Sequence, residues 1–86
     1  MNEYDIRVGS VVLSTQGRDK GMYFLVVSVG KGFVFLADGG MRKLNAPKKK
    51  NVKHVGLTNT VLDSGSMSTN RSLRRALNAY SGVAQD

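Results

Sequence analysis

Residues 8–29 read VGSVVLSTQGRDKGMYFLVVSV, two apolar segments joined by a polar loop. We expect strands at about Val8–Leu13 and Tyr23–Val29, because both segments are rich in β-branched and aromatic residues. The second segment is apolar at nearly every position, which predicts a central, largely buried strand. Between the two, Gly17 and Gly21 bound a turn, since glycine adopts backbone angles that other residues avoid. The predicted fold extends outward from this hairpin.

Further turn formers divide the next thirty or so residues into short segments. Short strands that are apolar on both sides favour a small, strongly bent antiparallel barrel, because a barrel hides both faces and leaves no open edge. Pro47 interrupts the pattern, since proline cannot donate to a strand ladder. The other predicted elements are hairpin turns at Gly30-Lys31-Gly32 and Asp38-Gly39-Gly40, strands at Phe33–Ala37, Met41–Leu44 and Val52–Leu57, and a cationic loop at Lys48-Lys49-Lys50.

The C-terminal part of the chain has helical periodicity. One of the three residues Ser-Thr-Asn at positions 68–70 can cap the start of the helix, and Gly82 can end it. We therefore divide the chain into a barrel at residues 1–60, a polar linker at 61–70 and a basic amphipathic helix at 71–81. The apolar stripe that predicts the helix and packs it on the barrel is Leu73, Ala76, Leu77 and Tyr80.

Composition excludes several classes of function. The chain has 86 residues, no cysteine and one histidine, so neither a disulfide framework nor a zinc or Ser-His site is expected. Gly30-Lys31-Gly32 lacks the ending of a phosphate-binding P-loop. No carboxylate lies in a catalytic arrangement, and we expect no enzyme, no metal and no cofactor. The start of the sequence resembles no signal peptide and no apolar run spans a bilayer, which predicts a cytoplasmic protein. We expect it to be a monomer.

The distribution of charge is more informative than its sum of +7. Between Gly40 and Leu57 there is no Asp or Glu, and such an excess points to an anionic partner, nucleic acid before anionic membrane. The alternative is a solvated face that keeps a small domain in solution. The cations in this interval are Arg42, Lys43, Lys48, Lys49, Lys50 and Lys53, and a second cluster is Arg71, Arg74 and Arg75.

The glycine-bounded loop is a second candidate contact. Arg18 and Lys20 suit phosphate oxygens, since Arg can donate two parallel hydrogen bonds and Lys is a flexible point charge. Asp19 is expected to cap backbone N–H groups of the turn or to pair with Arg18 or Lys20. Gly17, Asp19 and Gly21 are therefore assigned a structural role. The alternative is a purely structural turn whose charges are solvated.

The aromatic residues and the histidine are interpreted mainly as structural. Tyr23, Phe24, Phe33 and Phe35 have strand spacing and are expected in the core, so base stacking on the sheet is not predicted. His54 is expected to be a half-buried strand residue, with stacking on an RNA base as the alternative.

Together these segments resemble a known family. The first strand, glycine loop and second strand resemble a KOW motif, which is found in ribosomal proteins and NusG-type transcription factors. Nearly the whole chain is similar to short bacterial KOW-domain proteins related to archaeal and eukaryotic large-subunit ribosomal proteins. This resemblance implies an SH3-like five-stranded antiparallel barrel with a C-terminal helix that binds ribosomal RNA. It rests on Gly17–Gly21, Phe24–Val27, Leu36–Gly39, Arg42–Leu44, Pro47–Lys50 and Leu73–Tyr80.

The sequence therefore predicts a non-catalytic module that binds structured RNA through phosphates. The alternatives are a protein-interaction module of the transcription or translation machinery and a DNA-binding module without RNA preference. The expected RNA contacts are Arg18, Lys20, Arg42, Lys43, Lys48, Lys49, Lys50, Lys53 and His54, with Arg71, Arg74 and Arg75 as possible secondary contacts.

Overall fold

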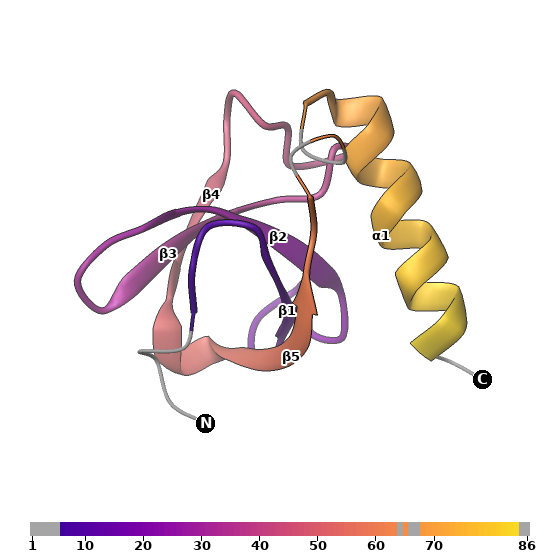
Figure 1. Ribbon diagram of the computed structural model, residues 1–86. Coiled ribbons are helices and arrows are strands. Elements are labelled where there is room, and N and C mark those ends of the chain that lie inside the picture. The colour runs from indigo at the N-terminus through magenta and orange to yellow at the C-terminus, as the bar shows by residue number, and fades with distance from the viewer. Residues whose placement is uncertain (1–5, 64, 66–67, 85–86) are drawn as a thin grey trace.

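Five antiparallel strands and a C-terminal helix form the molecule, as the computed structural model shows (Figure 1). The structure describes residues 6–63, 65 and 68–80, together with the backbone of residues 81–84. The fold is mainly β, as predicted. Its elements are β1 Ser10–Ser14, β2 Tyr23–Val29, β3 Phe33–Ala37, β4 Lys48–Asn51, the short 3-10 helix η2 Val52–His54, β5 Val55–Val61 and α1 Asn70–Ala84.

The strands lie in the order β4-β3-β2-β1-β5. The first four form a meander, and β5 returns to pair with β1, where Val12 lies opposite Leu57. On its other side β1 pairs with β2, and Val12 lies opposite Phe24. The predictions for the second and third strands are confirmed, and β2 is central in the sheet.

The prediction for the fourth strand is wrong. Residues 41–44 form no strand; the carboxylate of Asp38 instead accepts hydrogen bonds from the backbone N–H groups of Gly40 and Arg42, both at 2.9 Å, which hold this segment as a turn. The strand is Lys48–Asn51, in the segment predicted to be a cationic loop. The fifth strand begins three residues later than predicted, because η2 turns the chain first.

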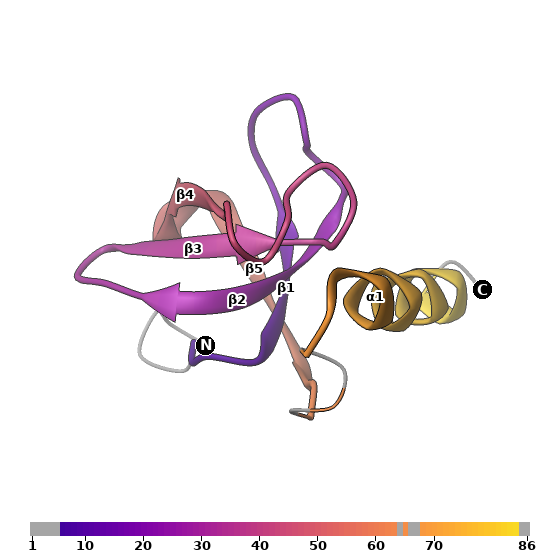
Figure 2. The same cartoon turned by 90° about the horizontal axis from the view of Figure 1, so that it is seen from above.

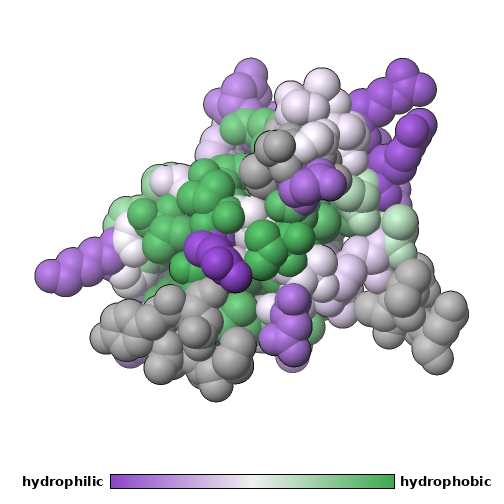
Figure 3. Space-filling view, in the orientation of Figure 1, coloured by the Kyte–Doolittle hydropathy of each residue, from purple (hydrophilic) through white to green (hydrophobic). Residues whose placement is uncertain are grey.

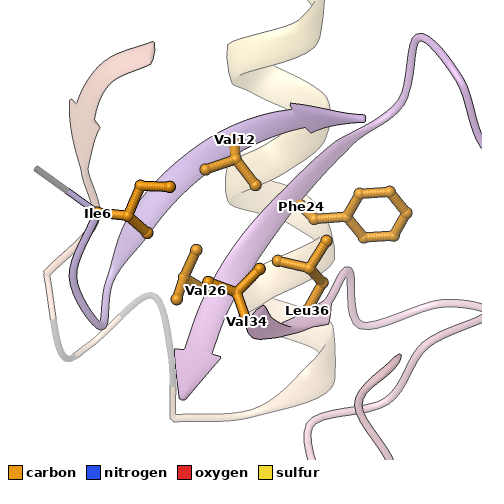
Figure 4. Close-up of a cluster of buried hydrophobic side chains, with 6 residues drawn as sticks. All are labelled: Ile6, Val12, Phe24, Val26, Val34 and Leu36. Carbon is orange, nitrogen blue, oxygen red and sulfur yellow. The ribbon is translucent and has the colours of Figure 1, made fainter. Parts of the chain in front are cut away.

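Two apolar clusters explain why β2 is apolar on both faces. Side chains on one face point into the curl of the sheet, as Figure 4 shows, and Val52, Val55 and Leu57 pack against them. On the other face, Leu25 and its neighbours are covered by Leu73 and Leu77 of α1. Figure 2 shows α1 lying alongside the sheet. The inner cluster is Ile6, Val12, Phe24, Val26, Val34 and Leu36, and the outer one is Val11, Leu25, Ala37, Leu73 and Leu77.

The helix packs through the stripe that the sequence predicts. The ring of Tyr80 meets that of Tyr23 edge to face, with centroids 5.0 Å apart. Thr69 caps the helix: its Oγ1 accepts from the N–H of Ser72 at 3.0 Å, and the Ser72 hydroxyl accepts from the N–H of Thr69. The predicted end at Gly82 is wrong, since α1 continues to Ala84.

No helix among the described residues is long and apolar enough to cross a membrane.

The sheet is strongly curled. Strand β4 is at one edge and is separated from β1 by β3 and β2. Nevertheless the Nζ of Lys50, on β4, donates to the carbonyl oxygen of Gln16, just after β1, at 2.7 Å. The two edge strands are also consecutive along the chain, joined by η2 (Figure 1). The curl therefore brings β4 to the loop between β1 and β2.

Candidate nucleic-acid interface

Backbone hydrogen bonds and two glycines shape the loop between β1 and β2. Gly17 and Gly21 have φ angles of 93° and 92°, which side chains with a Cβ rarely adopt. The N–H of Gly21 donates to the carbonyl of Ser14 at 2.8 Å, so hydrogen bonding to the end of β1 begins two residues before β2. Arg18 and Lys20 are both exposed at the tip. The loop is thus tight, and its cations face solvent.

Asp19 is bound from three directions. Its Oδ1 accepts from the Ser14 hydroxyl at 2.6 Å and from Lys50 Nζ at 2.8 Å. Its Oδ2 accepts from Lys48 Nζ at 3.2 Å. The prediction that Asp19 caps the turn or pairs with Arg18 or Lys20 is therefore wrong: its ion-pair partners, among the described residues, are two lysines of β4.

This network keeps Asp19 ionised. Burial acts to raise the pKa of the Asp19 carboxyl, but hydrogen bonds from Lys50, Ser14 and Lys48 and the charge of Lys50 outweigh burial. The net result is a pKa far below the usual value of 3.8.

The three consecutive lysines of β4 have different environments. Lys50 and Lys48 lie opposite Val34 and Leu36, which belong to the inner cluster, so both side chains project to the inner face. Lys50 is only 7% exposed and its ammonium is held by Asp19 and Gln16. Lys49 points outward. Of the three, Lys49 presents its charge to solvent most directly.

A second loop, residues 38–44, is attached to the start of α1. The side-chain oxygen of Asn70, the first residue of α1, accepts from the N–H of Leu44 at 2.7 Å. Gly39 has a φ of 80°, and a Cβ there would collide with the carbonyl oxygen of Asn70 and lie 2.9 Å from the N of Arg74. The loop and the helix therefore approach as closely as their backbones allow, and the orientation of one fixes that of the other.

Cations from four segments, the two loops, β4 and α1, meet where these segments come together. Arg18 and Arg42 line one hollow, which shares Met22, Asp38 and Met41 with an adjoining hollow. The adjoining hollow has a volume of about 640 Å³ and extends along Lys43 to Arg74 of α1. Arg71 and Arg75 line a third hollow beside Arg74. We call these adjoining hollows the basic cleft; its cations are Arg18, Arg42, Lys43, Lys48, Arg71, Arg74 and Arg75.

The fold separates the other predicted contacts from this cleft. Lys20 is exposed on the same loop as Arg18 but does not line the three hollows. Lys53 and His54 lie in η2, between β4 and β5. Both are exposed, so the expectation of a half-buried strand histidine is wrong. The cations at positions 42–53 form one basic interval of the sequence. In the structure they belong to at least two surfaces.

Two methionines of the basic cleft were not singled out in the sequence. Met41 is 85% exposed and Met22 is 41% exposed, although both are apolar. Met22 follows the glycine-bounded turn, and Met41 is predicted to begin a strand, so no local pattern marks either side chain as exposed. Figure 3 shows one face of the molecule, where apolar side chains gather near the centre with a few hydrophilic ones among them, and other hydrophilic side chains project at the margin.

The described residues contain no group of three or more His, Cys, Asp or Glu side chains that could hold a metal ion. No protein-family model and no curated protein matches this sequence. The shape and charge of the surface are therefore the main basis for inferring a function.

Proposed function

We propose that the chain is a non-catalytic RNA-binding module whose basic cleft holds phosphates of a folded RNA. The observation that carries this proposal is the convergence of cations from the 17–21 loop, the 38–44 loop and α1 around one cleft. The cleft also contains two carboxylates, but Asp19 is held by Ser14, Lys48 and Lys50, and Asp38 accepts two backbone N–H groups. The seven cations of the basic cleft outnumber these two carboxylates, so the cleft keeps an excess of positive charge.

In this proposal the basic cleft acts by holding the phosphates of the RNA in a fixed position. Arginine donates bidentate hydrogen bonds to phosphate, and cations held at fixed spacing lose little entropy on binding. The close approach of Gly39 to α1 and the hydrogen bond from Leu44 to Asn70 provide that fixed spacing. Contacts of this kind orient an RNA without reading its bases.

The resemblance to KOW-domain proteins extends the proposal to ribosomal RNA in the cytoplasm, bound by a monomer. The same resemblance suggests that the curled sheet is an SH3-like barrel. Support comes from the contact of Lys50 with Gln16, which spans the space between β4 and the end of β1. Co-sedimentation with the large ribosomal subunit, lost as salt rises, tests the ribosomal part separately.

Filter binding against salt tests the phosphate contacts. If four to six phosphates are neutralised, log K should fall against log salt with a slope of about −3 to −5. Arg74→Gln should reduce that slope by about 1. Arg7→Gln is the matched control, because Arg7 is exposed but precedes β1, at the opposite end of that strand from Arg18. An affinity for ribosomal RNA that is indifferent to salt, or equal losses in the two variants, would contradict the proposal. Duplex DNA as competitor distinguishes an RNA-binding from a DNA-binding module.

A second candidate function has one observation in its favour. The exposed methionines Met22 and Met41 line the same cleft, and flexible thioether side chains suit adaptable protein interfaces. A protein-interaction module would retain its partners in a pull-down after nuclease treatment, whereas an RNA-binding module would release them.

A further inference from the structure

Two phenylalanines lie on the outer face of β3, away from the basic cleft. Their neighbours Val34 and Leu36 point into the inner cluster, so Phe33 and Phe35 point outward. Neither ring belongs to either apolar cluster. The helix covers this face at Ala37 but leaves the two rings half-exposed. The expectation that both belong to the core is therefore wrong.

The two rings are held in a fixed arrangement. They pack edge to face, with centroids 5.5 Å apart and planes at 89°. A Cβ at Gly30 would collide with the Phe33 ring, so that ring lies directly on the hairpin backbone. A pair of rings fixed in this way can accept a flat ligand without losing side-chain entropy.

Two lysines belong to this part of the surface. Lys49 Nζ lies over the Phe33 ring, 4.4 Å from its centroid, which leaves Phe35 as the ring without a cation over it among the described contacts, and Lys31 is exposed in the hairpin that precedes β3. Strands β2 to β5 and the 30–32 turn contain no Asp or Glu. A ligand that combines a flat aromatic system with a negative charge complements this surface, and a nucleotide is such a ligand.

The order of residues agrees with this chemistry. Lys31-Gly32-Phe33-Val34-Phe35 follows the order basic, glycine, aromatic, any residue, aromatic. The RNP1 strand of RNA-binding sheets begins with basic, glycine, aromatic, Gly or Ala, and aromatic residues, and it displays two aromatic rings on one face for base stacking. Val34 departs from that pattern at the fourth position, whereas the basic residue, the glycine and the two aromatic residues agree with it.

We propose that Phe33 and Phe35, with Lys49 beside them, form a stacking platform for unpaired bases of RNA. The platform is separate from the basic cleft, which binds phosphates alone. This inference rests on the proposed function for the identity of the partner. An RNA that engages both surfaces would be folded at the cleft and single-stranded at the platform.

Fluorescence anisotropy with two probes of equal charge tests the platform: labelled decauridylate and a ten-unit abasic phosphodiester strand. The wild-type protein should bind decauridylate about tenfold tighter, because only that strand has bases to stack. Phe35→Leu should lower the affinity for decauridylate about tenfold and leave the abasic strand and the salt slope unchanged. Arg74→Gln, in the cleft, should leave the ratio of the two affinities unchanged.

Equal binding of both strands by the wild-type protein, or equal affinities of wild type and Phe35→Leu for decauridylate, would overturn the platform. If the protein nevertheless binds folded RNA in a salt-dependent way, the proposal that the basic cleft binds phosphates is unaffected. Failure to bind any RNA would overturn both. If Phe35→Leu fails to fold, NMR of the wild-type protein provides a second test. Upfield shifts of the Phe33 and Phe35 ring resonances on addition of decauridylate would support stacking, and unchanged resonances would refute it.

Discussion

The Nζ of Lys50 lies 2.8 Å from Oδ1 of Asp19, and this ion pair joins edge strand β4 to the loop that follows β1. The two residues are 31 positions apart in the chain. The pair fixes the curl of the sheet and orders the loop that presents Arg18 to the basic cleft. It also means that the charge of Lys50, although part of the densest basic run, acts inside the protein.

Replacement of Lys50 should damage the fold far more than replacement of its neighbour. Lys50→Met leaves the carboxylate of Asp19, which is 13% exposed, without its shortest cationic contact and should lower the free energy of unfolding by about 3 kcal/mol. Lys49→Met removes the same charge from an outward position and should cost less than about 1 kcal/mol. Urea denaturation of the two variants measures the difference. Equal losses would show that the Asp19 pair contributes no more than a surface contact.

The stability of the protein should fall in acid because of Asp19. Its pKa is lowered in the folded state, so below about pH 4 the unfolded chain binds a proton that the folded protein does not. This contribution is therefore complete above about pH 4 and declines at about 1.4 kcal/mol per pH unit as the pH falls further. Asp19→Asn should be less stable at neutral pH and should lack this part of the acid dependence.

Urea midpoints of wild type and Asp19→Asn between pH 2 and 6 test this prediction. The two curves should converge as the pH falls. Parallel curves would mean that another group dominates the acid transition.

The sequence predicts the parts of this fold that depend on local patterns. The β-branched run of β2, the Gly30-Lys31-Gly32 turn and the stripe through Leu73 and Leu77 each specify one element, and the structure confirms them. The failure at residues 41–44 has a local cause: the side chain of Asp38 stabilises a wider turn than two glycines suggest.

The candidate site depends on pairing across the sheet, which local patterns do not contain. Lys48, Lys49 and Lys50 are chemically identical, and only their register against β3 separates two inner lysines from an outer one. Likewise, Arg74 of α1 lines the same hollow as Lys43 only because Gly39 allows the helix to dock there. Which of the cations line the basic cleft could therefore be learned only from the tertiary structure.

The contact between Gly39 and α1 gives a prediction with a matched control. Gly39→Ala places a Cβ against backbone atoms of Asn70 and Arg74 at a φ of 80°, and should cost about 3 kcal/mol or more. Gly32→Ala has a similar φ of 83° but meets nothing within 4 Å, so it should cost only the backbone strain, about 1 kcal/mol. Thermal denaturation of both variants isolates the docking contact, and similar melting temperatures would refute it.

Arg71 offers a test of whether the helix arginines serve a partner. The residue lies in the first turn of α1, which contains no acidic residue, and the helix dipole disfavours a cation there. Arg71→Glu should therefore raise the free energy of unfolding by about 0.5 kcal/mol. The same change should weaken binding of ribosomal RNA about tenfold at low salt and reduce the salt slope by about 1, because Arg71 lines the basic cleft.

Arg75→Glu is the control for this prediction. It lies one turn further along α1 and lines the same hollow, so it should weaken RNA binding without the gain in stability. A protein in which Arg71→Glu is more stable and binds RNA as well as wild type would place Arg71 on a merely solvated surface. A loss of affinity paired with a gain in stability would show that the arginine is retained for RNA at the expense of the helix.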